Sequence, residues 1–170
     1  MFKDNREIPL AYTDIQRRLY FENNRKTVYP LWKWNIGIHK AGRNFPAMVA
    51  KKFFKDLGYK VLDRYYLVRQ PRKRENNPGY KKLRRIFGRE KINKVIEESK
   101  PSLKIQPGGD PDLFVYNTKN REFFFVEVKE NDHLTENQKN VFPIIDKYLA
   151  PVYLVRVRSF NSWLKIKLDK

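Results

Sequence analysis

The segment EFFFVEVK at residues 122–129 constrains the fold of this chain most strongly, because its middle is continuously apolar from Phe123 to Val126. A strand with one wet face alternates apolar and polar residues, whereas a strand covered on both faces is apolar throughout. Polar residues return at Glu127 and Lys129, which project from the same face because side chains alternate along a strand. The segment therefore predicts an α/β fold whose covered central strand carries polar chemistry at one end.

A second strand, DLFVY, is predicted just before this one, and the polar residues NTKNR between the two strands favour a turn. If the strands pair as a hairpin, Asp112 meets Glu127 and Lys129. The two carboxylates and the backbone carbonyl of Val128 can then hold one hard divalent cation. Such a cation lowers the pKa of a bound water, and Lys129 can orient or deprotonate that water or stabilise charge on a phosphate. A simple ion pair between Glu127 and Lys129 is the alternative interpretation.

The chain has no cysteine, which excludes disulfides, thiolate catalysis and zinc-finger sites. His39 and His133 are the only histidines, so a site with several histidine ligands is not expected. Oxygen ligands remain, and they favour Mg²⁺ or Mn²⁺ over Zn²⁺.

The charge balance points to a polyanionic partner, because 37 Lys and Arg residues face 19 Asp and Glu residues and leave a net charge of +18. Nucleic acid is the leading candidate, since contacts with phosphates release condensed counterions. A membrane surface is the weaker candidate, because no basic amphipathic helix with a lipid-like apolar face is present in the sequence. Neither a membrane span nor the apolar core of a signal peptide is found, so we expect an intracellular protein, in the cytoplasm, at the nucleoid or in the cytoplasm of a viral host.

Residues 70–104 are predicted to form a basic helical insertion, in which an exposed loop precedes a helix over 80–99 that Gly88 can split. We predict that this insertion contacts nucleic acid through seven residues: Arg72, Lys73, Arg74, Lys81, Lys82, Arg84 and Arg85. A run of charge is usually only a solvated face. Here, however, glutamates are scarce until Glu97, which favours the binding interpretation.

The remaining elements are predicted from apolar periodicity and from the positions of Gly, Pro and Asn. They are a helix over 45–57 capped by Asn44, a strand over 59–68, a loop over 100–110, a helix over 135–149 kinked at Pro143, a strand over 151–160 and an edge strand at 163–168. Residues 1–44 are predicted to be the least regular part, with a short helix across 12–23. Trp32 and Trp34 are interpreted as core residues, with base stacking as the alternative.

Three motifs follow one another in a fixed order: G-G-x-P-D-L from Gly108, F-x-V-E-V-K from Phe124, and x-x-D-x-L-T-x-x-Q, which ends at Gln138. This order and spacing resemble the VRR-NUC branch of the PD-(D/E)XK nuclease superfamily. The resemblance implies a restriction-endonuclease-like core, with a central mixed β-sheet flanked by helices. It also implies a single nuclease domain over 1–170, made of an irregular part (1–44), the basic insertion (70–104) and a motif-bearing core (108–158).

Carried over residue by residue, the resemblance assigns Asp112 and Glu127 as metal-binding carboxylates, Lys129 as the catalytic lysine and Gln138 as the motif glutamine near the active site. Gln138 is also placed to form a capping box with Thr135, and both roles can coexist.

Two further aspartates, Asp110 and Asp132, lie within the motifs. One acid that the resemblance leads us to expect is absent from the first helix. Asp132 matches a motif aspartate that is interpreted as structural. Many members of the wider superfamily carry a metal-binding glutamate in the first core helix, but residues 45–57 contain none. Either fewer ligands hold one metal, or Glu7, Glu22 or Asp110 substitutes, or activity is reduced.

The expected function is therefore a metal-dependent endonuclease that hydrolyses phosphodiester bonds in DNA. The resemblance favours structured or branched DNA as the substrate and allows a homodimer. Two alternatives remain open: a nucleic-acid-binding module that keeps the fold without catalysis, and a restriction endonuclease that cuts a short sequence.

Overall fold

A mixed five-stranded sheet forms the centre of the protein, with strand order β1-β5-β4-β3-β2. The computed structural model describes residues 6–17, 34–68, 74–105 and 109–162. β1, β5 and β4 are parallel, whereas β3 runs antiparallel to both β4 and β2. β4 is the central strand, as its apolar run predicts. The strands are β1 (Glu7–Tyr12), β2 (Lys60–Leu62), β3 (Leu113–Asn117), β4 (Glu122–Lys129) and β5 (Val152–Ser159).

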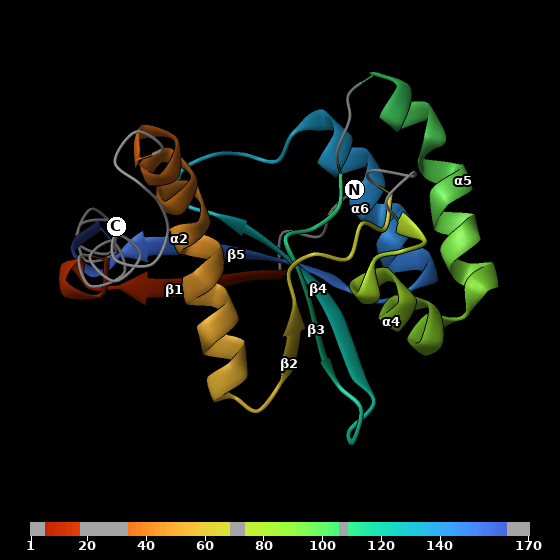
Figure 1. Ribbon diagram of the computed structural model, residues 1–170, viewed down its shortest axis with the longest axis horizontal. Helices are drawn as coiled ribbons and strands as arrows, with labels where there is room; N and C mark the ends of the chain where they lie inside the picture. Colours follow the sequence, from red (N-terminus) through yellow and green to blue (C-terminus); the bar gives the residue numbers. More distant parts are fainter. Residues whose placement is uncertain (1–5, 18–33, 69–73, 106–108, 163–170) are drawn as a thin grey trace.

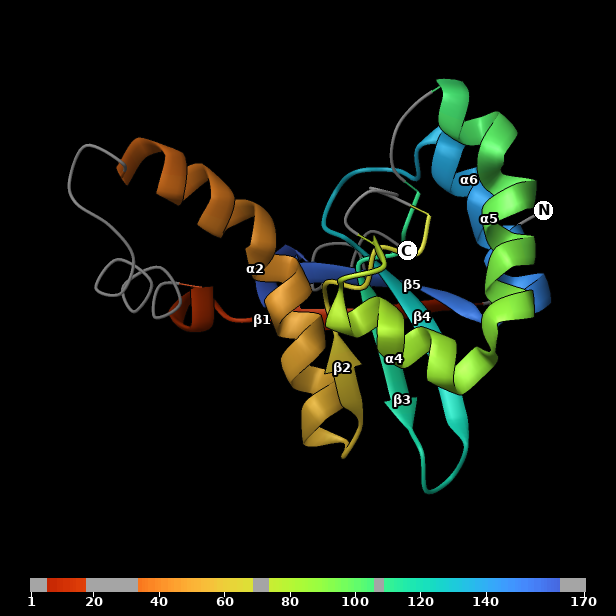
Figure 2. The same cartoon turned by 45° about the vertical axis from the view of Figure 1, so that its right-hand side comes forward.

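Helices cover both faces of this sheet (Figures 1 and 2). The long helix α2 (Trp34–Asp56) lies on one face. The other face carries α4 (Pro78–Phe87), α5 (Arg89–Ile105) and α6 (Glu136–Tyr148). The predicted α/β class with a restriction-endonuclease-like core is confirmed. None of the described helices combines the length and the apolarity that a membrane crossing requires.

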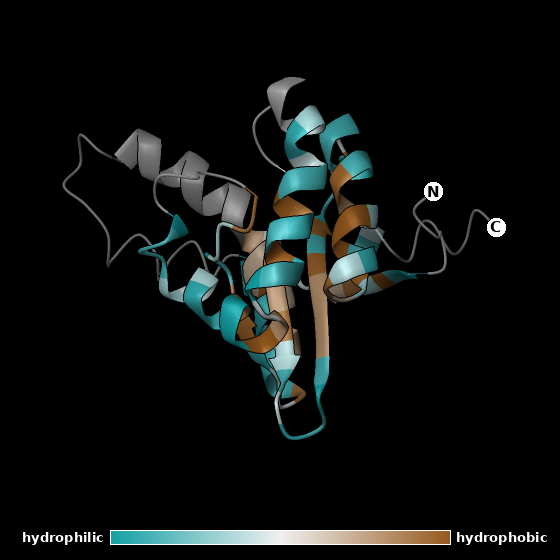
Figure 3. Ribbon diagram, turned by 90° about the vertical axis from the view of Figure 1, so that its right-hand side faces the viewer, coloured by the Kyte–Doolittle hydropathy of each residue, from teal (hydrophilic) through white to brown (hydrophobic). Residues whose placement is uncertain are grey.

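Each face of β4 contributes to a different hydrophobic cluster, which explains why its middle is apolar on both sides. Phe125 packs in the cluster under α4, α5 and α6, while Val126 and Val128 pack in the cluster under α2. In Figure 3, the brown, hydrophobic part of the β3–β4 hairpin lies above its teal, hydrophilic turn. Because Phe125 and Glu127 share a face, the same alternation places Glu127 and Lys129 on the side of α6.

The predicted irregular N-terminal part contains an edge strand. β1 pairs in parallel with β5, with Leu10 opposite Val157. Pro9 lies within it, and an edge strand tolerates proline because only one side of the strand needs its N–H groups. Of the short helix predicted across 12–23, residues 14–17 are helical, Tyr12 belongs to β1, and residues 18–23 lie outside the described part of the chain.

The helix predicted to begin at Phe45 begins at Trp34, so Asn44 is not its cap. Pro46 therefore lies inside a helix of 23 residues rather than in its first turn, and Figure 2 shows α2 bent along its length. A proline inside a helix removes one backbone hydrogen bond and commonly kinks the helix.

Other boundaries differ in ways that concern the site. The strand predicted over 59–68 is reduced to β2, and residues 63–68 form an irregular segment. The helix predicted over 80–99 is split at Gly88, as expected. Its second part, α5, continues to Ile105, so the first half of the loop predicted over 100–110 is helical. The edge strand predicted at 163–168, and the side chains of Trp32 and Trp34, lie outside the described residues.

Candidate active site

The hairpin of β3 and β4 brings the motif residues together at the middle of the sheet. Leu113 pairs with Val126, so Asp112, one residue earlier, lies across from Glu127. The Asp112 carboxylate accepts a hydrogen bond from the Val128 N–H at 3.0 Å, which fixes its orientation. The N–H and C=O of one strand residue leave from the same edge, so the Val128 carbonyl also faces the Asp112 side.

Glu127 is buried, with 3% of its surface exposed, and its two oxygens have different surroundings. Oε1 accepts a hydrogen bond from the Gln138 amide at 2.6 Å and lies 3.1 Å from the Lys129 ammonium. Among the described residues, Oε2 has no hydrogen-bond partner. Burial, followed by the negative charge of Asp112, raises the pKa of Glu127 to about 8, although Lys129 and Gln138 oppose the rise.

Lys129 is also buried and is held by two carboxylates. Its Nζ lies 3.1 Å from Glu127 and 3.0 Å from Asp132. Burial lowers the pKa of Lys129, but Glu127 and Asp132 outweigh this effect and raise the pKa above its ordinary value. Lys129 is therefore an ammonium cation at neutral pH, suited to orienting water or stabilising negative charge rather than to removing a proton.

Gln138 performs both tasks that its sequence context suggests, using opposite ends of one amide. Its Oε1 accepts a hydrogen bond from the Thr135 N–H at 3.0 Å and completes the capping box of α6. Its Nε2 donates to Glu127. The start of α6 thus fixes the position of a buried carboxylate on β4.

The donor set around Asp112 and Glu127 fits a hard divalent cation. It offers a half-buried carboxylate, the unpartnered Glu127 Oε2 and a backbone carbonyl, all of them oxygen donors. Within the described part of the chain, no cluster of three or more His, Cys, Asp or Glu residues that could hold a metal ion is found. Asp112, Glu127 and the backbone carbonyl of Val128 are the groups that would hold such a cation.

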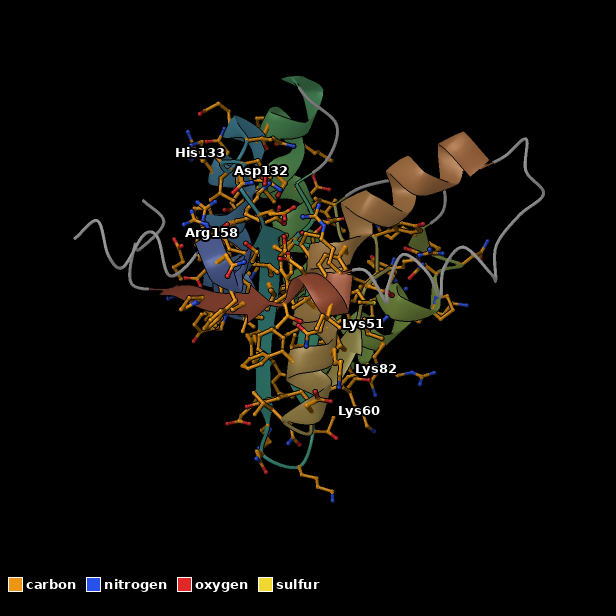
Figure 4. All side chains as sticks on the ribbon, turned by 90° about the vertical axis from the view of Figure 1, so that its left-hand side faces the viewer. Lys51, Lys60, Lys82, Asp132, His133 and Arg158 are labelled. Atoms are coloured by element: carbon orange, nitrogen blue, oxygen red, sulfur yellow. The ribbon has the colours of Figure 1, made fainter. Side chains whose placement is uncertain are left out.

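Two of the three acids considered as substitutes for a first-helix glutamate have other partners. Glu7, on β1, lies 3.2 Å from the Arg156 guanidinium. Asp110 is buried and accepts a hydrogen bond from the Val68 N–H at 2.6 Å. Glu22 lies outside the described residues. His133 lies in the exposed loop after β4, next to Asp132 (Figure 4).

Arg156 belongs to the polar network around the site but was not singled out in the sequence. It lies beside Lys129 in the parallel register of β4 and β5. Its guanidinium donates a hydrogen bond to the backbone oxygen of Asp132 at 2.6 Å, so it supports the loop that holds Lys129. The alternation VYLVRVRS contains the signal, since it places Arg156 and Arg158 on the sheet face that carries Lys129.

The predicted nucleic-acid-binding residues fall into three groups. Arg72 and Lys73 lie outside the described residues. Arg74 was predicted to be exposed but is buried, where it donates to the Val68 backbone oxygen and stacks over the Tyr80 ring. It is a structural residue, because its guanidinium is used by the fold.

The other four predicted binding residues lie on α4, and they differ in exposure. Lys81 and Arg85 are exposed one helical turn apart. Arg84 pairs with Glu75 at 2.9 Å. Lys82, labelled in Figure 4, lies over the Tyr116 ring at 5.4 Å. Lys81 and Arg85 are therefore the best-placed cations of this helix for a phosphate partner.

Comparison with known proteins places the chain in a family. The family model described as the VRR-NUC domain matches residues 58–159, more than half of the chain, and the match spans β2 to β5 with every motif residue of the site. No curated protein shows significant similarity to the chain. The match confirms the resemblance seen in the motifs. The chain belongs to the VRR-NUC domain family, a nuclease domain family of the PD-(D/E)XK type.

Proposed function

We propose that this protein is an endonuclease that uses Mg²⁺ or Mn²⁺ to hydrolyse phosphodiester bonds in DNA. One observation carries the metal requirement: a buried carboxylate oxygen, Glu127 Oε2, lacks a hydrogen-bond partner among the described residues. The negative charge of Asp112 also acts on the Glu127 carboxyl group and raises its pKa. Burying two carboxylates together is costly unless a cation or a proton compensates them. A divalent cation would supply that compensation.

Each residue of the site has a distinct proposed role. Asp112, Glu127 and the Val128 carbonyl would hold the cation, which polarises a phosphoryl oxygen and lowers the pKa of a bound water. Gln138 fixes Glu127 Oε1 and leaves Oε2 for the cation. Lys129, held as an ammonium between two carboxylates, faces the negative charge that develops on the phosphate.

The excess of positive charge supports DNA as the partner. The net charge of +18 favours phosphate contacts, and the exposed cations of α4 are the proposed surface for them. Structured or branched DNA is the proposed substrate class, and a homodimer, testable by sedimentation, is the proposed assembly.

The test is cleavage of supercoiled plasmid, flap and four-way-junction DNA with Mg²⁺ or Mn²⁺. Glu127→Ala and Lys129→Ala should each lower the rate at least a hundredfold. Glu90→Ala and Lys94→Ala are the matched controls, because these residues form an exposed ion pair on α5, and both variants should cleave like the wild type. Absence of cleavage on every substrate, or equal cleavage by the Glu127 and Lys129 variants, would contradict the proposal.

A non-catalytic binding module is the second candidate, and the composition of α2 favours it. The only acid in α2 is Asp56, at its last residue, and it pairs with Lys52. A pure binder should show no Mn²⁺ binding that depends on Asp112, so titration of the wild type and of Asp112→Asn by calorimetry separates the two functions. For an active enzyme, the positions of the cut ends on plasmid DNA distinguish a restriction endonuclease from a structure-selective one.

A further inference from the structure

A cleft of about 260 Å³ opens directly beside Asp112. Its walls are the irregular segment 63–66, which follows β2, and residues 110–112, which precede β3. The cleft therefore shares one residue with the proposed metal site and extends away from it. Its volume is large enough to admit one nucleobase.

The walls of this cleft are tied together by buried hydrogen bonds. The Tyr65 hydroxyl donates to the Pro111 backbone oxygen, and the Val68 N–H donates to Asp110. The start of α4 packs closely against the wall formed by residues 63–66. A Cβ added at Gly79 would lie 2.9 Å from the Tyr65 Cα. These contacts tie the two walls of the cleft to each other and to α4.

Tyr66 adopts a backbone conformation that its side chain disfavours. Its φ is 47°, in the left-handed region that glycine and asparagine adopt more readily than a bulky residue does. Its neighbours Tyr65 and Leu67 are buried and fixed, whereas Tyr66 is only half-buried and lines the cleft. Strained backbone of this kind clusters at ligand sites, because a fold alone would be better served by glycine.

The charges that line the cleft favour a nucleotide once the acids are compensated. Asp63 pairs with Lys51 at 2.6 Å, and this ion pair, against the opposing effect of burial, lowers the pKa of Asp63. Asp110 accepts the Val68 N–H, and Asp112 is a proposed metal ligand. Arg64 is exposed and adds a guanidinium to the lining.

We propose that this cleft binds one unpaired nucleotide next to the scissile phosphate, with the Tyr66 ring stacked on its base and Arg64 in contact with its phosphate; this proposal rests on the nuclease function proposed above. Stacking on an aromatic ring accepts any base, because every base has a π-face. A paired base is already stacked within its duplex and cannot enter the cleft. The protein should therefore prefer DNA that has an unpaired nucleotide at the cut.

The test measures binding to a single strand that carries 2-aminopurine and to the same strand in a duplex. Ca²⁺ replaces Mg²⁺ and Mn²⁺, so that a divalent cation still compensates Asp112 while cleavage is suppressed. Tyr66→Ala should lose about tenfold in affinity for the single strand, together with the fluorescence quenching that stacking produces. Its affinity for the duplex should not change. Tyr66→Phe should restore both single-strand signals, because it keeps the ring.

Two further variants separate a binding role from a structural one. Tyr66→Gly should lose the same affinity while melting no lower than the wild type, because glycine adopts the left-handed conformation readily. Phe160→Ala removes an aromatic side chain that is 54% exposed, and it should bind like the wild type.

Three results would overturn the inference: unchanged single-strand binding by Tyr66→Ala, an equal loss on duplex DNA, or a lower melting temperature for Tyr66→Gly. The nuclease function is judged separately, by plasmid and junction cleavage with the wild type. Cleavage by the wild type together with normal single-strand binding by Tyr66→Ala would overturn this inference alone.

Discussion

Replacing Glu127 with glutamine should stabilise the metal-free protein in a pH-dependent way. In the folded protein, burial and the charge of Asp112 raise the pKa of Glu127 from 4.5 to about 8. The folded state therefore holds its proton more tightly than the unfolded chain does. Stability contributed by this group is present below pH 4.5 and is lost as the pH rises to about 8. The substitution Glu127→Gln removes the ionisation and keeps an oxygen that can accept from Gln138 and Lys129.

The size of the effect follows from the pKa difference. At about 1.4 kcal/mol per pKa unit, a rise from 4.5 to about 8 corresponds to at most about 5 kcal/mol. This upper limit already includes the attraction of Lys129. The glutamine side chain puts an NH₂ donor where the carboxylate had an oxygen, and a buried donor without a partner costs about 1–3 kcal/mol, so we expect a net gain of about 2 kcal/mol at pH 9. For a chain of this length, such a gain raises the melting temperature by about 4–8 °C. At pH 5 the two proteins should differ by less than about 1 kcal/mol, because Glu127 is protonated in the folded state.

Thermal melts in EDTA at pH 5, 7 and 9 measure this difference, and Glu90→Gln, on the exposed face of α5, is the control. Addition of Mn²⁺ at pH 9 should reverse the order, because the cation binds the wild type and not the variant. A variant that is less stable than the wild type at pH 9, or a difference that does not change with pH, would refute the reasoning about Glu127.

Three further outcomes are expected. Thr135→Ala and Gln138→Ala should each lower the stability by about 1 kcal/mol, because each removes the capping box of α6. Only Gln138→Ala should also lower kcat, because Gln138 also holds Glu127. Thermal melts measure the loss of stability, and cleavage rates measure the loss of kcat. Gly79→Ala should destabilise the protein by about 1–3 kcal/mol in denaturant titrations, because its Cβ would overlap the backbone of the cleft wall. Lys81→Ala combined with Arg85→Ala should weaken DNA binding and reduce the salt dependence of log K by about 2, measured by fluorescence anisotropy between 50 and 200 mM salt.

The motif-bearing hairpin could be predicted from the sequence because its signals are local. A continuous apolar run, a polar turn and alternating Glu127 and Lys129 define β3, β4 and the shared face without reference to the rest of the chain. The capping box of Gln138 is equally local, since all its atoms lie within one helical turn.

The features that were missed depend on contacts between distant segments. β1 pairs with β5 in parallel, and parallel strands are not joined by a short turn that could be recognised in the sequence. The burial of Arg74 depends on its hydrogen bond to the Val68 backbone oxygen, and the left-handed conformation of Tyr66 is one that a bulky residue rarely adopts, so no local pattern predicts either. Because Arg74 lies in a run of cations, its charge suggested a surface role that its contacts contradict.

β1 and α2 contribute to the fold but supply none of the proposed ligands. The matched family segment, 58–159, contains every proposed ligand and the cleft, but it excludes both elements. Without α2, the apolar side chains of Val126, Val128, Val155 and Val157 would lose their cover, and without β1 the edge of β5 would be open to pairing with other chains. A protein trimmed to its recognisable segment would therefore keep a complete set of reactive groups and still aggregate.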